Sequence, residues 1–169
     1  MLPRSLSNGI CSLNVGEDRL AFTVMMELTH SGAVVNYEIF ESIINVKYKI
    51  SYEKVFDLLE NADPELEKKY SEHIEELVMM RNLADALNWR RQQEGYINFD
   101  FPETKVVIDQ DGKTVDIKPY SVTFANNIIE EFMLLCNRVV AEEFHWRDVP
   151  FLYRVHEDPD PEKIGELAR

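Results

Sequence analysis

The sequence predicts an α+β fold, in which β-hairpins form part of a mixed β-sheet and two long helices pack on that sheet. Segments rich in Val, Ile, Phe and Tyr come in pairs separated by short turn sequences, a pattern typical of hairpins. Two longer segments repeat their apolar residues with the spacing of an amphipathic helix. The length of 169 residues and the hydrophobic fraction of 45% suit one domain with a sizeable core.

The first third of the chain is expected to contain most of the strands. Residues 1–19 are interrupted by Pro and Gly and are predicted to be irregular. Strands are predicted over 20–28 and 34–43, with a Thr-His-Ser-Gly turn at 29–32 between them. A further strand is expected over 44–50.

Helices are expected next. Ser51 is a typical N-cap residue, and the apolar residues that follow it predict a short helix over 52–60. Asp63-Pro64 is a typical helix start, because Asp caps the first turn and Pro fits it. Apolar residues keep helical spacing from there, which predicts one long helix over 63–94 that ends at a glycine.

The second half of the chain contains another hairpin and the second long helix. Asp111-Gly112 is a strong turn signal and predicts a hairpin with strands over 104–108 and 114–118. The second long helix is predicted over 122–144, and a strand is predicted over 151–155.

The sequence ends on an unusually short helix. Asp158-Pro159-Asp160-Pro161 is a helix start, yet Arg169 follows only two turns later, just as the apolar face begins. We interpret this end as the boundary of a fragment of a longer protein. The alternative is a short docking tail.

Charge and hydropathy restrict the class of protein. The net charge is −13, with 31 acidic and 18 basic residues, which argues against an autonomous nucleic-acid binder because phosphate affinity comes mostly from Lys and Arg. No apolar run approaches the ~18 residues of a membrane span, and the first residues lack a signal-peptide pattern. We therefore expect a cytoplasmic protein with no membrane partner. Cys11 and Cys136 are far apart in sequence and are expected to be reduced.

The sequence contains no pattern of a complete catalytic centre. It has no glycine-rich phosphate loop and no Gly-x-Ser-x-Gly nucleophile motif. Its four histidines do not have the spacing of a zinc site, so no metal ligands are assigned.

The helix over 122–144 is expected to be buried on two sides, because Met133-Leu134 lies opposite its main apolar face. Asn126, Glu130 and Asn137 fall on the second side, in one stripe. A carboxylate between two amides requires hydrogen-bond partners when it is buried. The stripe is either a structural network or, at Glu130, an acceptor for a ligand hydroxyl.

Three aromatic residues, Tyr96, Phe99 and Phe101, lie close together in an extended segment after the first long helix. They either pack into the core or form a platform on which nucleic-acid bases stack, which is worth roughly 1–3 kcal/mol per base.

Seven segments, taken in their order and spacing, resemble the middle of the catalytic RNB domain of the ribonuclease II / ribonuclease R family of 3′→5′ exoribonucleases. The segments are 1–3, 6–14, 19–21, 50–55, 99–103, 128–137 and 150–157. The words Phe-Asp-Phe-Pro-Glu at 99–103 and Tyr-Arg-Val-His-Glu at 153–157 favour the ribonuclease R branch.

The resemblance implies a function for three residues. An aromatic residue at the place of Phe99 stacks on the 3′-terminal base of the RNA. A glutamate at the place of Glu130 and a tyrosine at the place of Tyr52 approach the terminal riboses. A carboxylate and a phenol can both hydrogen-bond a 2′-hydroxyl, which DNA lacks. The resemblance thus implies a fragment of a processive enzyme that hydrolyses single-stranded RNA from its 3′ end to nucleoside 5′-monophosphates.

The resemblance also implies that residues 1–169 are a partial catalytic domain. The aspartates that hold Mg²⁺ in the family lie upstream of the segment matched by Met1, and an arginine motif lies downstream of Arg169. The cold-shock and S1 RNA-binding domains of the family are also outside this sequence. We therefore expect the fragment to contribute substrate binding and no metal chemistry. The alternative is a non-catalytic interaction module that has kept the RNB fold.

Overall fold

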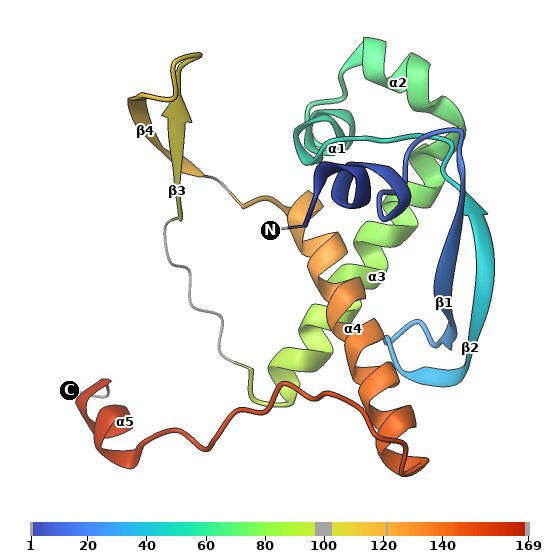
Figure 1. Cartoon of the computed structure of the whole chain (residues 1–169), viewed down its shortest axis with the longest axis vertical. Coiled ribbons are helices and arrows are strands. Elements are labelled where there is room, and N and C mark those ends of the chain that lie inside the picture. The colour runs from blue at the N-terminus through green and yellow to red at the C-terminus, as the bar shows by residue number, and fades with distance from the viewer. Residues whose placement is uncertain (1, 97–102, 121, 168–169) are drawn as a thin grey trace. The chain divides into compact units, whose positions relative to one another are not determined.

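The protein has an α+β fold, as predicted, in a computed structural model that describes residues 2–96, 103–120 and 122–167 (Figure 1). Its elements in chain order are η1 (Ser5–Ile10), β1 (Asp18–Leu28), β2 (Val34–Asn45), α1 (Tyr52–Leu59), α2 (Pro64–Tyr70), η2 (Ser71–His73), α3 (Ile74–Gln93), β3 (Glu103–Ile108), β4 (Thr114–Tyr120), α4 (Phe124–Trp146) and α5 (Pro161–Leu167). The contacts divide the chain into two units, residues 1–136 and 137–169, and α4 has residues in both.

β1 and β2 form the predicted first hairpin. They pair antiparallel from Asp18↔Asn45 to the turn, where Gly32 has a φ of 75°. A side chain at Gly32 would place its Cβ 2.9 Å from Leu87 Cδ2 of α3, so this turn contacts the helix closely. The separate strand predicted over 44–50 is wrong, because β2 itself continues to Asn45 and ends there.

β3 and β4 form the predicted second hairpin, with Gly112 in its turn at a φ of 79°. In the described part of the chain the strands make two separate two-stranded antiparallel sheets, and a single parallel bridge joins Val15 to Val46. The expected mixed sheet is therefore represented here by two hairpins.

The long helix predicted over 63–94 is broken into α2 and α3. Tyr70 leaves the helical conformation, with φ −116° and ψ 21°, and the short turn η2 joins the two helices. Tyr70 is buried at this break and packs edge-on against Tyr48, with ring centroids 6.1 Å apart. Burial of an aromatic ring outweighs helix continuity here, which the apolar spacing did not reveal.

The predicted helix starts are confirmed. The Ser51 hydroxyl accepts a hydrogen bond from the Lys54 N–H at the start of α1. At the start of α2, the Asp63 carboxylate accepts hydrogen bonds from the backbone N–H groups of Glu65 and Leu66. These contacts satisfy donors that a helix leaves unpaired at its first turn.

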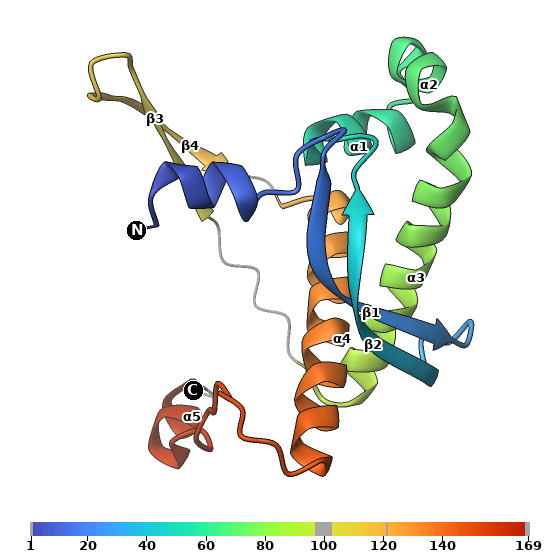
Figure 2. The same cartoon turned by 45° about the vertical axis from the view of Figure 1, so that its right-hand side comes forward.

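Helices α3 and α4 lie side by side over the first part of α4 (Figures 1 and 2). Both contribute buried residues. The buried apolar residues of the described chain are Leu58, Tyr70, Ala84, Leu87, Ala125, Ile128 and Val139. The expectation that α4 is buried on both sides is wrong, because Met133 is 58% exposed and Leu134 is also exposed.

Residues 137–169 contain the end of α4 and the short helix α5. The strand predicted over 151–155 is wrong, since these residues form no strand. Instead the ring of Phe151 stacks on Phe144, with centroids 4.8 Å apart, and contacts Tyr153 edge-on. The start of α5 is as predicted, with the Asp160 carboxylate accepting from the Glu162 N–H. None of the described helices is long and apolar enough to cross a membrane.

Candidate functional site

Tyr52 is the first residue of α1 and is 42% exposed. The Ser51 cap fixes the start of this helix. One turn further along α1, Phe56 contacts Phe124 of α4, with ring centroids 5.6 Å apart. This contact ties α1 to the start of α4, and Tyr52 remains partly exposed.

Asn126 has a structural role at the start of α4. Its side-chain oxygen accepts hydrogen bonds from the backbone N–H and the hydroxyl of Thr123, at 3.0 and 3.1 Å. The Thr123 carbonyl in turn accepts the first helical hydrogen bond. The contact from the Thr123 N–H to the Asn126 side chain corresponds to one half of a capping box, with Asn in place of the usual Glu or Gln. The Asn126 amide also donates to the Tyr120 hydroxyl at 3.1 Å, so this residue takes part in a local hydrogen-bond network.

The predicted stripe of Asn126, Glu130 and Asn137 is not a buried stripe. Asn137 is exposed, and the Glu130 side chain is 49% exposed. The buried acid of α4 is the next residue, Glu131, at 4% exposure. Glu131 lies three residues after the buried Ile128, which places it on the packed face of the helix. Glu130 is therefore an accessible carboxylate, and the prediction that it was buried is wrong.

Glu131 pairs with two side chains of α3. Its Oε1 accepts from Arg91 Nη2 at 2.5 Å and from Asn88 Nδ2 at 2.9 Å. The same Arg91 Nη2 lies 3.8 Å from Glu130 Oε1. The Arg91 guanidinium also covers the ring of Tyr96, 3.7 Å from its centroid. We call Arg91, Asn88, Glu130, Glu131 and Tyr96 the Arg91 cluster. A buried carboxylate requires such partners, because an unpaired charge in a low-dielectric interior is very unfavourable.

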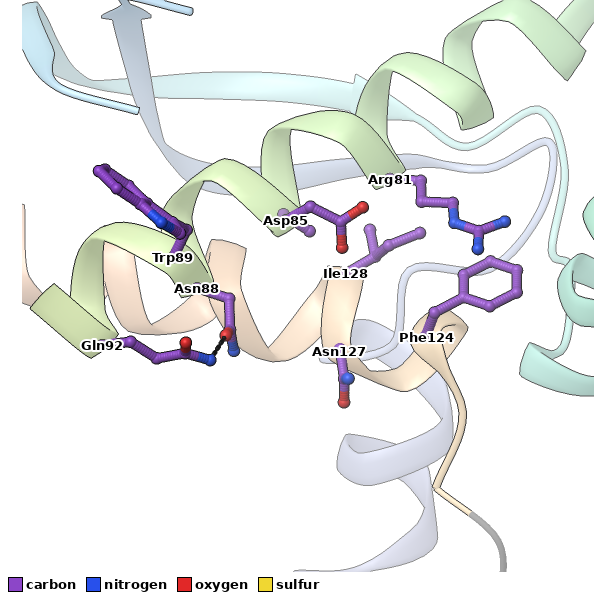
Figure 3. A pocket seen from close by; sticks show the side chains of 9 residues that line it. Arg81, Asp85, Asn88, Trp89, Gln92, Phe124, Asn127 and Ile128 are labelled. Atoms are coloured by element: carbon purple, nitrogen blue, oxygen red, sulfur yellow. Dashed lines mark hydrogen bonds between the residues drawn. The ribbon is translucent and has the colours of Figure 1, made fainter. Parts of the chain in front are cut away.

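A pocket of about 330 Å³ lies between α3 and α4 (Figure 3). Its lining consists of Arg81, Ala84, Asp85, Asn88, Trp89, Gln92, Phe124, Asn127 and Ile128. Arg81 lies over Phe124 at one end, 4.0 Å from the ring centroid, and also pairs with Glu60 at 3.2 Å. Toward the other end, Gln92 donates a hydrogen bond to Asn88. The pocket therefore adjoins the Arg91 cluster through Asn88.

The structure does not join the predicted residues into one hydrogen-bonded site. In the described part of the chain no hydrogen bond or ion pair links Tyr52 to Glu130. Phe99 lies outside the described residues. The described residues also contain no group of three His, Cys, Asp or Glu side chains that could hold a metal ion. The described residues therefore do not fit a magnesium site.

Comparison with known proteins identifies the family. The model of the RNB domain matches residues 1–169. The chain belongs to the RNB domain family. Ribonuclease R of Thermotoga maritima is 44% identical over 168 residues, which are 99% of this chain and 23% of that protein. Ribonuclease R of Aquifex aeolicus is 43% identical over 167 residues, with 99% of this chain and 24% of that protein covered.

A solved structure supports the same assignment. The structure of Mycoplasma genitalium RNase R in complex with ribose-methylated single-stranded RNA matches with a TM-score of 0.86 and 27% identity. The match covers 98% of this chain and 26% of that one. The predicted resemblance to ribonuclease R is therefore confirmed, and the chain spans about a quarter of the length of these relatives.

Sequence reasoning missed Glu131, Arg91 and Asn88. A signal for Glu131 was present in its spacing, since it lies three residues after Ile128 and four before Leu135 on the packed face of α4. The spacing gave no way to find its partners, because Arg91 precedes it by 40 residues on another helix.

Proposed function

We propose that this RNB domain chain is part of a longer 3′→5′ exoribonuclease that degrades single-stranded RNA to nucleoside 5′-monophosphates. The observation that carries the proposal is the 44% identity to Thermotoga maritima ribonuclease R over 99% of the chain. The structural match to an RNase R bound to single-stranded RNA supports RNA as the partner.

Within that enzyme we assign substrate binding to Tyr52, Phe99 and Glu130. Tyr52 and Glu130 are both partly exposed, so a phenol and a carboxylate are accessible to ligand hydroxyl groups. The 2′-hydroxyl of a ribose can donate to Glu130 and bond to the Tyr52 hydroxyl, and deoxyribose can do neither. Phe99 is assigned to stacking on the terminal base, which does not depend on the sugar.

Other parts of the longer protein supply the metal chemistry in this proposal. Aspartates elsewhere in the longer protein would hold Mg²⁺, which would supply the metal chemistry of phosphodiester hydrolysis. The net charge of −13 supports this division, because the cationic surface that binds phosphates has to come from elsewhere. The cold-shock and S1 domains of the family are the proposed source.

The ribose assignment is tested in the full-length enzyme with Tyr52→Phe and Glu130→Ala. Each removes one hydrogen-bonding group, so we expect the ratio of kcat/KM for RNA over DNA of equal sequence to fall roughly tenfold per variant, about 1.4 kcal/mol. Glu75→Ala, an exposed glutamate at the start of α3, is the control and leaves the ratio unchanged. An equal ratio in the wild type and in the variant that carries both Tyr52→Phe and Glu130→Ala would show that these residues do not recognise the ribose.

The division of labour is tested on the 169-residue chain itself. We expect no Mg²⁺-dependent release of nucleotides from single-stranded RNA and weak RNA binding at physiological salt. A Glu130→Ala chain prepared in parallel is the control for a contaminating nuclease. Release of mononucleotides by the purified chain, above the release seen with this variant, would contradict the proposal. A full-length protein that binds RNA without degrading it in Mg²⁺ would instead favour the non-catalytic module.

A further inference from the structure

Arg91, in the last turn of α3, contacts groups from two separate parts of the chain. It pairs with Glu130 and Glu131 of α4, and its guanidinium covers Tyr96, which follows the helix. The Arg91 carbonyl also accepts a hydrogen bond from the Tyr96 N–H at 3.2 Å.

The two carboxylates that Arg91 contacts have different surroundings. Glu131 is 4% exposed and accepts hydrogen bonds from Arg91 and Asn88, so it serves as a fixed anchor. Glu130 is about half exposed and lies at 3.8 Å, within ion-pair range but beyond a hydrogen bond. The anchored guanidinium therefore attracts the neighbouring carboxylate and leaves its lone pairs available to another donor.

The same guanidinium also contacts Tyr96, which lies shortly after the end of α3 in sequence. A guanidinium 3.7 Å from an aromatic centroid is a close cation–π contact, and it fixes the chain just after the end of α3. Tyr96 precedes Phe99 by three residues. One side chain thus touches both the residue expected to contact the ribose and the start of the segment expected to contact the base.

We propose that Arg91 is a positioning residue for substrate recognition, which holds the Glu130 carboxylate in place for the terminal ribose while Glu131 anchors it. The inference rests on the proposed role of Glu130 in reading the ribose. Glutamate has a flexible side chain, and a binding carboxylate that is already oriented loses less conformational freedom when the ligand binds.

The planar guanidinium of arginine matters for this role. Its Nη2 lies against both carboxylates while the plane of the group covers the Tyr96 ring, and the compact ammonium group of lysine does not stack on a ring in this way. Arg91→Lys therefore keeps a positive charge beside the buried Glu131 and removes the geometry. A role in stability alone would reduce the amount of active enzyme for RNA and DNA equally, so the selectivity ratio of this variant separates the two explanations.

The test uses the full-length enzyme with Arg91→Lys, Glu130→Ala and the double variant. The readout is the ratio of kcat/KM for RNA over DNA of equal sequence, which does not depend on the fraction of active enzyme. We expect Arg91→Lys to lower the ratio about fivefold. In the Glu130→Ala background it should change the ratio less than about twofold, because the group that Arg91 positions is gone.

Arg90→Lys is the matched control, because Arg90 is the neighbouring residue on α3 and is more exposed. Among the described side-chain contacts it pairs with Glu94, the residue that follows α3. We expect it to leave the ratio unchanged. Glu131→Gln is the second variant, used where Arg91→Lys yields too little folded protein. It keeps the shape of the anchor and removes its charge, so it is also expected to lower the ratio.

The outcomes separate the inference from the proposed function. A ratio that falls with Glu130→Ala and stays unchanged with Arg91→Lys overturns the role of Arg91 and leaves the role of Glu130 intact. Effects that multiply in the double variant also overturn it, because Arg91 would then act by another route. A ratio unchanged by Glu130→Ala overturns the ribose assignment and this inference together.

Discussion

The hairpins β1–β2 and β3–β4 are built on the same turn. In each, the N–H of the first turn residue, Thr29 or Asp109, donates to a carbonyl oxygen four residues later at 2.9 Å. A glycine with positive φ stands in the fourth position, at 75° for Gly32 and 79° for Gly112. In each hairpin the register also shifts beside the turn. The local sequence therefore determines the turn in both cases.

The surroundings of the two turns differ. Gly32 is buried, and a Cβ added there would lie 2.9 Å from the side chain of Leu87. A Cβ added at Gly112 would meet no atom within 4 Å, and Ile117 on β4 is 63% exposed. The conformation of a turn is thus set locally. How much a hairpin contributes to the stability of the whole fold depends on what packs against it.

The largest expected difference is between an apolar side chain that packs against the first turn, Leu87 of α3, and one on the exposed second hairpin, Ile117 of β4. Leu87 is 7% exposed, so Leu87→Ala should lower the free energy of unfolding by about 2–5 kcal/mol through lost burial and a cavity. Ile117→Ala, on the exposed hairpin, should change it by less than about 0.5 kcal/mol. Urea unfolding followed by circular dichroism measures both. Similar losses in the two variants would break the comparison.

The two glycines provide the next test. Gly32→Ala adds a methyl group at a positive φ and against Leu87, and should lower the free energy of unfolding by about 2–4 kcal/mol. Gly112→Ala has the same backbone cost without the contact, so it should lower the free energy of unfolding by at most about 1–2 kcal/mol. The midpoint of urea unfolding distinguishes the two values.

A double-mutant cycle isolates the contact. In the Leu87→Ala background, the new methyl at position 32 has space, so the cost of Gly32→Ala should fall to that of Gly112→Ala. An equal cost of Gly32→Ala in both backgrounds would show that the close approach to α3 contributes nothing.

Predictability from the sequence follows the same division between local and distant contacts. The hairpin turns and the starts of α1, α2 and α5 depend on residues within four positions, and all of them were predicted. The break at Tyr70 and the absence of a strand after Pro150 were not, because they depend on aromatic contacts made by Tyr48 and Phe144.

The candidate site shows the same limit. The spacing on α4 located an acidic position but chose Glu130 as the buried one, and the structure buries Glu131. The two differ by one residue, or about 100° around a helix, and the partner that decides between them is Arg91 on α3. The resemblance to ribonuclease R pointed to Glu130 through its motif, independently of burial, and the binding role of Glu130 stays a prediction.

The smallest expected effect concerns the side chains that close the turns. The Thr29 hydroxyl accepts from the Ala33 N–H at 3.0 Å, and the Asp109 carboxylate accepts from the Asp111 and Lys113 N–H groups, both at 2.9 Å. Asp109→Ala therefore removes two hydrogen bonds from backbone N–H groups, whereas Thr29→Ala removes one. Yet only the turn at Thr29 lies against α3 in the described contacts.

We therefore expect Thr29→Ala to lower the free energy of unfolding by about 0.5–1.5 kcal/mol. Asp109→Ala should change it by less than about 0.5 kcal/mol, while amide hydrogen exchange in β3 and β4 becomes faster. An equal loss of global stability in both variants would mean that the second hairpin unfolds together with the helices, and the contrast between the two hairpins would then be wrong.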